Sequence, residues 1–175
     1  APDLALIGDP KAGDRLTWIG HASFLLQLCG ANLLLDPVFS LRIGWLYRRH
    51  LAPGLTRQQL PPIDLLLISH SHYDHLDAPS IAAIDRSATF VVPRGLARRF
   101  VKHGFVRVVE LEWWDRVAFG GVEVTFVPAR HWSKRSPFDT NRSLWGGYVI
   151  RAAQGDGASV YFSGDTAWFE GFAEI

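Results

Sequence analysis

The stretch His70-Ser71-His72-Tyr73-Asp74-His75 directly follows the apolar run Ile63-Asp64-Leu65-Leu66-Leu67-Ile68-Ser69. The apolar run does not alternate with polar residues, which is typical of a strand buried on both faces in the centre of a layered α/β sheet. Three imidazoles and one carboxylate then follow within six residues, and both ligand types bind Zn²⁺ or another borderline divalent ion. Because three of the seven histidines fall in these six positions, a chance cluster of solvated loop histidines is a poor alternative. The pattern therefore predicts a metal site at the end of a buried strand.

The length and composition of the chain are typical of one globular domain. Of the 175 residues, 48% are hydrophobic and 20% are charged, which excludes a disordered chain. Apolar runs stay well short of the roughly 18 residues of a membrane span. The net charge of +1 provides no bulk attraction to nucleic acid, and the single Cys29 excludes an internal disulfide and a cysteine-rich metal site. We expect a single domain over residues 1–175.

Two features indicate that the chain is truncated at its C-terminal end or otherwise incomplete. It contains no methionine. Residues 166–175 carry apolar side chains at helical spacing and stop without a cap or a Gly or Pro stop signal. The spacing predicts a helix over 166–175 that is cut off in its second turn.

Between these ends, strands are expected in runs that short helices interrupt. The predicted strands cover 16–19, 24–28, 32–35, 63–69, 89–92, 105–111, 122–127, 147–151 and 159–163. Helices are expected over 77–85 and 95–103, because Asp77-Ala78-Pro79 marks a helix start and Gly104 a helix end. The first dozen residues are expected to form a lead-in segment, residues 38–60 an irregular insertion, and residues 154–157 a hairpin turn.

The spacing within the histidine-rich stretch divides its ligands between two ions. His70 and His72 are two residues apart, so both can point the same way from an extended segment and bind one ion. Asp74 and His75 follow where the chain turns into a helix, and these two could bind a second ion. Each ion then needs further ligands from elsewhere in the chain.

Two further candidates follow predicted strand ends, where open α/β sheets gather ligands. His131 follows the strand over 122–127, and Asp165 follows the strand over 159–163. The two oxygens of Asp165 could bridge both ions. The alternatives are a histidine stacked beside Trp132 and an Asx turn after Gly164.

The other histidines are weaker candidates. His21 could lie in a pocket beside the site or serve a turn or packing role. His50 and His103 lie in basic and exposed surroundings, where we expect no catalytic role.

Several blocks of sequence resemble known families. The stretch from His70 to His75 matches the metal signature of the metallo-β-lactamase fold. Longer blocks resemble the N-acylphosphatidylethanolamine-hydrolysing phospholipase D family: Pro61-Pro62-Ile63-Asp64, Glu110-Leu111-Glu112-Trp113-Trp114, His131-Trp132-Ser133-Lys134-Arg135, Leu144-Trp145-Gly146 and Phe162-Ser163-Gly164-Asp165-Thr166. The resemblance spans residues 17–175. It implies an α/β fold, the αβ/βα sandwich of two similar halves, of which this chain would hold the first half and part of the second.

Carried over residue by residue, the resemblance implies a site for two Zn²⁺ ions. The first zinc would be held by His70, His72 and His131. The second would be held by Asp74 and His75, with Asp165 bridging the two ions; as ligands, these three residues would carry the catalysis. The family also uses a histidine C-terminal to the bridging aspartate. No histidine follows His131 here, so the second site departs from the family pattern.

The resemblance further implies phospholipase D-type hydrolysis of N-acylphosphatidylethanolamine-like phospholipids by a metal-bound hydroxide. One alternative is a hydrolase of the same fold that acts on a soluble phosphodiester, a lactone or a sugar phosphate. A second alternative is a chain that binds metal and catalyses nothing. The expected partners are a phospholipid or a small phosphodiester, without nucleic acid; oligomeric state and compartment stay open.

Two basic segments bear on a phospholipid substrate. Lys134, Arg135 and Arg142 lie near His131 in sequence and could meet a phosphate, or they could be solvated loop charges. Residues 41–50 mix aromatic and basic side chains, which suits peripheral contact with lipid headgroups. The alternative for residues 41–50 is a loop folded over the core with charged tips.

Overall fold

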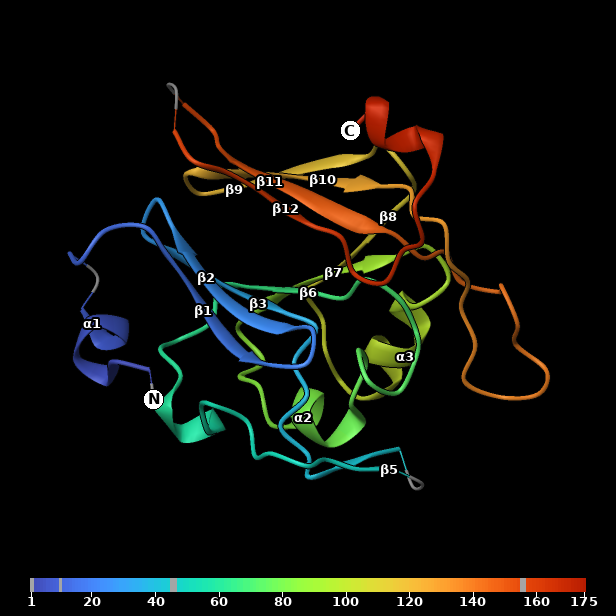
Figure 1. Cartoon of the computed structure of the whole chain (residues 1–175), viewed down its shortest axis with the longest axis horizontal. Coiled ribbons are helices and arrows are strands. Elements are labelled where there is room, and N and C mark those ends of the chain that lie inside the picture. The colour runs from blue at the N-terminus through green and yellow to red at the C-terminus, as the bar shows by residue number, and fades with distance from the viewer. Residues whose placement is uncertain (1, 10, 45–46, 155–156) are drawn as a thin grey trace.

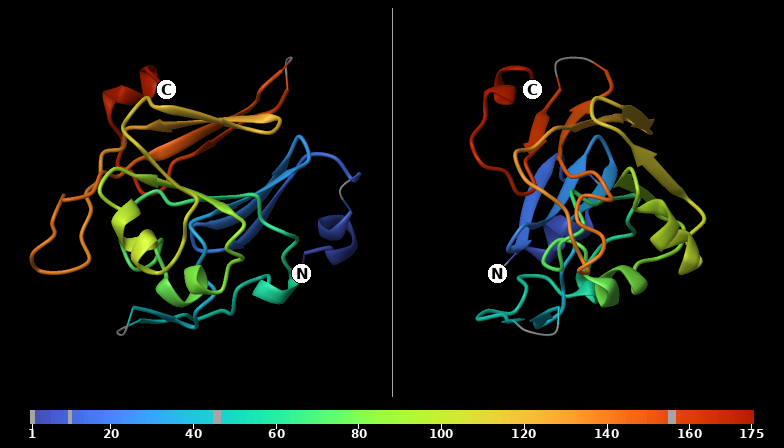
Figure 2. Two further views of the ribbon diagram at one scale, coloured as in Figure 1. Left: turned by 180° about the vertical axis from the view of Figure 1, so that it is seen from behind. Right: turned by 90° about the vertical axis from the view of Figure 1, so that its right-hand side faces the viewer.

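The computed structural model describes residues 2–9, 11–44, 47–154 and 157–175. Figure 1 shows two sheets packed face to face, with short helices on the outer face of the larger sheet. Within the described residues the larger sheet has six strands, in the order β1-β2-β3-β6-β7-β8, and the smaller sheet has four, in the order β12-β11-β10-β9. The two views in Figure 2 show the same layering from behind and from the side.

In the larger sheet, an antiparallel half is joined to a parallel half at β3. Its strands are β1 (Arg15–Gly20), β2 (Ser23–Leu28), β3 (Ala31–Leu35), β6 (Leu65–Leu67), β7 (Thr89–Pro93) and β8 (Val108–Leu111). The first three strands pair antiparallel, whereas β3 pairs with β6, β6 with β7, and β7 with β8 in parallel. The loops after β3 and β6 therefore leave the same edge of the sheet.

The smaller sheet is antiparallel throughout. Its strands are β9 (Arg116–Phe119), β10 (Val122–Val127), β11 (Gly147–Ala152) and β12 (Ser159–Phe162). The helices are α1 (Leu4–Gly8), α2 (Ala78–Ala82) and α3 (Ala97–Lys102), and two 3₁₀ turns are η1 (Arg57–Gln59) and η2 (Glu170–Ala173).

Strand β6 and the residue after it contribute to two separate hydrophobic cores. Leu65 and Leu67 pack in the cluster between the two sheets, together with residues such as Phe126. Leu66 and Ile68 pack in the cluster between the larger sheet and the helices. Because neighbouring side chains point to opposite faces of a strand, a strand covered on both sides must be apolar at every position. This burial confirms the prediction that the apolar run before His70 forms a strand covered on both faces.

Each of the nine predicted strands is present, and the helices predicted over 77–85 and 95–103 appear as the shorter α2 and α3. Strand β9 was not predicted, nor was helix α1, whose N-terminus is capped by the carboxylate of Asp3. The insertion predicted to be irregular contains η1 and the two-stranded ribbon of β4 (Arg42–Ile43) and β5 (Tyr47–Arg48). The centre of the predicted hairpin turn, residues 155 and 156, lies outside the described residues, as does Trp45 of the insertion.

The prediction of a helix over 166–175 is wrong. Ala167 forms a β-bridge with Arg130 and donates its backbone N–H to the Arg130 carbonyl at 3.0 Å. Phe169 is also extended, with φ −156° and ψ 161°, and only the 3₁₀ turn η2 follows. The apolar spacing of this segment favoured a helix. The contact with the loop after β10 instead holds the segment in an extended conformation.

Candidate metal centre

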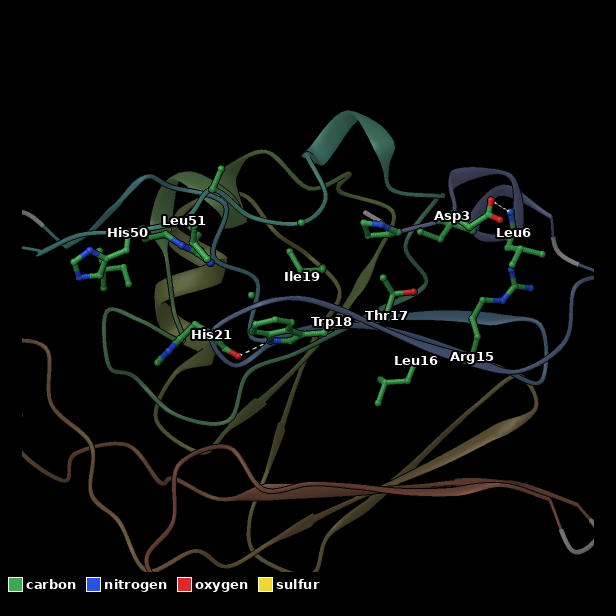
Figure 3. A pocket seen from close by; sticks show the side chains of 17 residues that line it. Asp3, Leu6, Arg15, Leu16, Thr17, Trp18, Ile19, His21, His50 and Leu51 are labelled. Carbon is green, nitrogen blue, oxygen red and sulfur yellow. Dashed lines mark hydrogen bonds between the residues drawn. The ribbon is translucent and has the colours of Figure 1, made fainter.

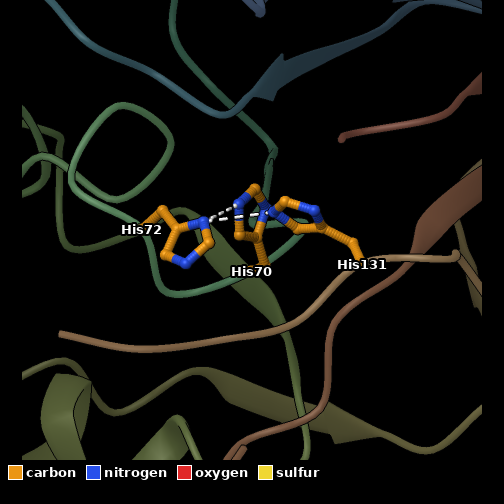
Figure 4. Close-up of side chains that lie close together, drawn as sticks. All are labelled: His70, His72 and His131. Carbon is orange, nitrogen blue, oxygen red and sulfur yellow. Dashed lines mark hydrogen bonds between the residues drawn. The ribbon is translucent and has the colours of Figure 1, made fainter. Parts of the chain in front are cut away.

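Three imidazoles from two loops form the first donor group. His70 and His72 follow β6, and His131 follows β10. Nδ1 of His72 lies 2.9 Å from Nε2 of His70 and 3.1 Å from Nε2 of His131 (Figure 4). One ligand atom from each ring lies within 4.8 Å of the others, so the three could hold one ion.

The geometry and charge of this group fit a metal ion. Two nitrogens bound to one tetrahedral Zn²⁺ at about 2.0–2.1 Å are about 3.3 Å apart, which is close to the observed separations of 2.9 and 3.1 Å. Burial lowers the pKa of His70 to about 2, and burial also lowers the pKa of His72 and of His131. The imidazoles are therefore neutral at pH 7, and the neutral ring is the form that binds a metal.

The second donor group contains Asp74 and His75, with His21 from the turn after β1. Nε2 of His21 lies 3.0 Å from Oδ2 of Asp74, and Nε2 of His75 lies 3.9 Å from the same oxygen. Asp165 lies between the two groups: its Oδ1 is 3.2 Å from Nε2 of His75, and its Oδ2 is 3.8 Å from Nε2 of His131. Each carboxylate oxygen of Asp165 thus faces one donor group.

The ring of His75 is held from behind by Asp36, and its front nitrogen faces the carboxylate of Asp165. Its Nδ1 donates to Oδ2 of Asp36 at 2.7 Å, and both side chains are fully buried. Its Nε2 is buried and, among the described residues, has no hydrogen bond of good geometry, although Oδ1 of Asp165 is close. A metal ion bound to this nitrogen would give it a partner of good geometry. A carboxylate behind a ligating histidine is a recurrent way to orient its ring.

Electrostatic contacts keep the second group ionised. The hydrogen bond with His21 lowers the pKa of Asp74, and contact with His75 lowers the pKa of Asp165 to about 2. Burial alone would lower the pKa of His75, but the carboxylates of Asp165 and Asp36 outweigh it and raise this pKa to about 10. Without metal, His75 is therefore protonated at pH 7, and an ion binding to its Nε2 must displace a proton.

Arg135 fixes the loop that carries the first ligands. Its Nη1 donates to the backbone carbonyls of Ser71 at 2.9 Å and Leu76 at 2.6 Å, with a longer bond of 3.4 Å to His72. The guanidinium also stacks 4.1 Å above the ring of Tyr73. Burial lowers the pKa of Arg135 to about 10, so the side chain remains charged at pH 7. The interpretation of Arg135 as a solvated loop charge is therefore wrong.

Two clefts adjoin the candidate centre. One, of about 560 Å³, is lined by His72 and Asp74 together with mostly apolar and aromatic side chains: Ile43, Tyr47, Tyr73 and Trp132. The other, of about 830 Å³, lies between β1, α1 and the segment 49–54, and it reaches the site only through His21 (Figure 3). The larger cleft contains none of the predicted ligands, so the smaller one is the better candidate for a substrate.

The structure brings all six predicted ligands together and adds a residue that was missed. Nε2 of His131 faces the ring of His72. The neighbouring Trp132 also packs against His72, edge-on and with 4.5 Å between the ring centroids. His21 lies beside the predicted ligands and lines a cleft, which agrees with the first of the two roles considered for it, a place in a pocket beside the site. No role in the site was predicted for Asp36, although it directly follows the predicted strand over 32–35, and a carboxylate at a strand end was a usable signal.

Histidines outside the site lie where no ligand role was expected. His50 lines the larger cleft, and His103 follows the C-terminal end of α3. Neither belongs to a group of described residues that could hold a metal.

Comparison with known proteins gives the family. Residues 31–175 match the family described as Beta-lactamase superfamily domain. N-acyl-phosphatidylethanolamine-hydrolyzing phospholipase D 1 of Caenorhabditis elegans is 33% identical, over 94% of this chain and 49% of that protein. A UPF0173 metal-dependent hydrolase of Opitutus terrae is 35% identical, over 89% of this chain and 64% of that protein. The chain thus spans about half the length of the first of these relatives.

Comparison with solved structures agrees on the fold. The crystal structure of isothiocyanate hydrolase from Delia radicum gut bacteria superposes with a TM-score of 0.74 at 22% identity, over 91% of this chain and 66% of that chain. At this identity the likeness shows the shared fold alone. Because the family match extends over more than half of the chain and the layered fold agrees with it, the chain belongs to the β-lactamase superfamily domain family and has the metallo-β-lactamase fold.

Proposed function

We propose that this protein is a zinc-dependent hydrolase of phosphodiester bonds that cleaves N-acylphosphatidylethanolamine-like phospholipids in the manner of a phospholipase D. The observation that carries the proposal is the position of Asp165, whose two oxygens lie 3.2 Å and 3.8 Å from one nitrogen of each donor group. Such an arrangement suits a pair of ions that share one bridging carboxylate. The 33% identity to the Caenorhabditis elegans phospholipase supports the substrate class.

The ligand assignment follows from the two donor groups. His70, His72 and His131 would hold the first ion, and Asp74 and His75 the second, with Asp165 between them. When bound, such ions supply Lewis acidity and a water of lowered pKa at neutral pH. The protein's own contribution is to hold the ligands in place, through Asp36, His21 and Arg135, before the substrate arrives.

The proposed reaction is a hydrolysis at phosphorus. The oxygen of a water forms a new bond to phosphorus, and the bond between phosphorus and the oxygen of the N-acylethanolamine group breaks. The electron pair goes to that leaving oxygen, which takes up a proton. The products are an N-acylethanolamine and phosphatidic acid, and neither oxidant nor reductant is needed.

The cleft beside His72 and Asp74 supports a lipid substrate. Its lining of Ile43, Tyr47 and Trp132 offers apolar surface directly next to the donor groups. Tyr47 is 71% exposed at the tip of the β4–β5 ribbon, close to the basic Arg48. Apolar and basic side chains together suit contact with the surface of a bilayer. Among the described residues, no helix has the length and apolar character to cross a membrane.

The test is an assay of metal content and of hydrolysis on the same samples. The unsubstituted chain should bind zinc and release N-acylethanolamine from N-acylphosphatidylethanolamine in mixed micelles. His72→Ala should lose the first ion and the hydrolysis, because Nδ1 of His72 is the atom that faces both other imidazoles. His103→Ala is the matched control and should keep both. Equal hydrolysis by the unsubstituted chain and by His72→Ala would contradict the assignment.

A soluble substrate is the second candidate, because the 35% identity to a UPF0173 metal-dependent hydrolase supports metal-dependent hydrolysis without naming a substrate, and one fold serves many substrates. A soluble phosphodiester such as bis(4-nitrophenyl) phosphate distinguishes the two. Hydrolysis of this compound without release of N-acylethanolamine would favour soluble phosphodiesters as the substrates. Zinc bound by the chain with hydrolysis of neither compound would leave a metal-binding chain without catalysis.

A further inference from the structure

A pocket separate from the two clefts has cationic side chains at half of its lining positions. It has a volume of about 330 Å³ and lies between α3 and the loop 133–143, which Figures 1 and 2 show on the same side of the molecule. Five of its lining residues are cationic and one is acidic: Arg98, Arg99, Lys102, Arg135 and Arg142, with Asp139. Because the net charge of the whole chain is only +1, this is a local concentration of positive charge.

The cations on α3 lack counter-ions within the described part of the chain. Arg98 and Lys102 are four residues apart, and Arg99 and Lys102 three apart, so they crowd one face of the helix. Like charges at these spacings are unfavourable in a helix. The structure places no carboxylate of a described residue within 4.0 Å of these three side chains or of Arg142.

The single acid of the pocket is already engaged elsewhere. Oδ1 of Asp139 accepts the backbone N–H of Arg135 at 2.9 Å and that of Ser136 at 2.7 Å. These bonds shape the loop. Arg99 attracts the Asp139 carboxylate only at longer range, and in the described ranges no ion pair within 4.0 Å joins Asp139 to a cationic side chain of the pocket. Arg135 directs Nη1 to the carbonyls behind the metal-binding loop, so a ligand in this pocket would lie on the far side of that loop from the imidazoles.

The size and charge of the pocket suit a phosphoryl group. Arginine binds phosphate oxygens in a two-pronged geometry, and lysine adds a compact charge. A phosphate monoester brings close to two negative charges and three acceptor oxygens, whereas a carboxylate brings one charge and two oxygens. A volume of about 330 Å³ accommodates this group with a small substituent.

We infer that the pocket between α3 and the loop 133–143 is a second binding site, which takes the phosphoryl group of a phosphate monoester and does so without the metal ions. Two sources present the same dianionic group: a soluble phosphate ester, and the headgroup of phosphatidic acid in a membrane.

Binding is measured on the chelator-treated chain, so that phosphate has no metal to bind. Glycerol 3-phosphate is titrated by calorimetry, and vesicles of phosphatidylcholine with and without phosphatidic acid are used in co-sedimentation. The pocket variant carries Arg98→Gln, Arg99→Gln and Lys102→Gln. The control variant removes three exposed charges elsewhere, through Lys11→Gln, Arg57→Gln and Arg151→Gln, and so has the same net charge.

The pocket variant should bind at least about tenfold more weakly than the unsubstituted chain, because charge-assisted hydrogen bonds are lost. The control should stay within about twofold, because its three charges lie outside the pocket lining and their loss changes only the weaker long-range attraction. If the pocket variant fails to fold, as judged by circular dichroism, Arg142→Gln on the opposite wall is tested in its place.

Specific loss of glycerol 3-phosphate binding supports a soluble ester as the ligand, and specific loss of vesicle binding supports the lipid headgroup. Equal affinities in the pocket and control variants overturn the inference, and so does the absence of binding of either probe to the unsubstituted chain. Because metal is absent throughout, these results are independent of the proposed hydrolase activity.

Discussion

Oδ2 of Asp36 accepts a hydrogen bond of 2.7 Å from Nδ1 of His75, and both side chains are fully buried. The same carboxylate accepts the backbone N–H of Ser69 at 2.7 Å and a bond from its hydroxyl. Asp36 follows β3 and Ser69 follows β6, so the contact joins the ends of two parallel neighbours directly behind the donor groups. The direction of the His75 ring is therefore set by a residue 39 positions away in the sequence.

Asp36→Asn should weaken binding of the second ion while the first ion stays bound. The amide keeps the shape of the carboxylate but loses the charge that orients His75 and makes its ring a stronger ligand. Loss of such a supporting group typically lowers metal affinity about 10–100-fold. Competition titrations with a zinc chelator measure both affinities.

Asp64→Asn is the matched control for this substitution, because Asp64 accepts a backbone N–H of Asn32 and touches neither donor group. It should leave both zinc affinities within about twofold, as expected for a site distant from the ligands. Equal losses in the two variants would mean that Asp36 acts through general stability alone.

His21→Ala should loosen Asp74 and weaken the second ion selectively. The hydrogen bond of 3.0 Å between these side chains is the largest cause of the lowered pKa of Asp74, so its loss raises that pKa and frees the carboxylate to rotate. Absorption of the cobalt-substituted chain reports the two sites separately. His50→Ala, in the same cleft but outside the donor groups, should leave the spectrum unchanged.

The metal-free chain should be most stable near pH 6.5. In the unfolded chain a histidine titrates at about 6.5. The folded pKa of His70 is lowered to about 2, so stability falls as the pH drops below about 6.5, where only the unfolded chain takes up that proton. The folded pKa of His75 is raised to about 10, so its stabilisation is complete below about 6.5 and is lost as the pH rises towards 10.

Urea denaturation in the presence of a chelator, at about pH 5, 6.5 and 9, measures this dependence. His75→Gln should abolish the decline on the alkaline side and retain the decline on the acidic side. A flat profile over this range would show that the two histidines titrate alike in the folded and unfolded chain.

Arg135→Gln should lower the free energy of unfolding by about 2–4 kcal/mol, since hydrogen bonds from a charged donor contribute about 1.5–3 kcal/mol and carbonyls lose their partner. The acceptors are the carbonyls of Ser71 and Leu76, on either side of the ligands. Arg135→Lys should recover part of the loss, because it keeps the charge without the planar geometry. Lys134→Gln, next in sequence, should change stability by less than about 0.5 kcal/mol. Urea denaturation of the three variants compares these values.

The chain's local pattern was enough to predict the layered sheet and the strand ends at which the candidate ligands lie. Residues 65–68 are apolar at every position, and only a strand covered on both faces requires that, as the split of Leu65 and Leu66 between two cores confirms. His70 and His72 follow at once, so their placement at the strand end required no knowledge of distant contacts. His131 and Asp165 were predictable for the same reason, because each follows a strand.

The sequence pattern gave a wrong prediction where a contact between distant residues determined the local conformation. Residues 166–175 have helical apolar spacing, yet the bridge between Ala167 and Arg130 keeps the segment extended. Strand β9 was missed because it pairs with β10 across a short turn at Gly120 and Gly121, and its own residues carry weak apolar alternation.

By itself, the sequence determined which residue types were available for a metal and which strand ends would carry them, because both properties are local. The tertiary structure alone decided which side chains support them: Asp36 behind His75, His21 beside Asp74, and Arg135 behind the loop, with separations of 39, 53 and 59 residues or more. Periodicity shows which face of a segment is buried. It does not show which distant residue packs against that face, since this depends on strand order and register.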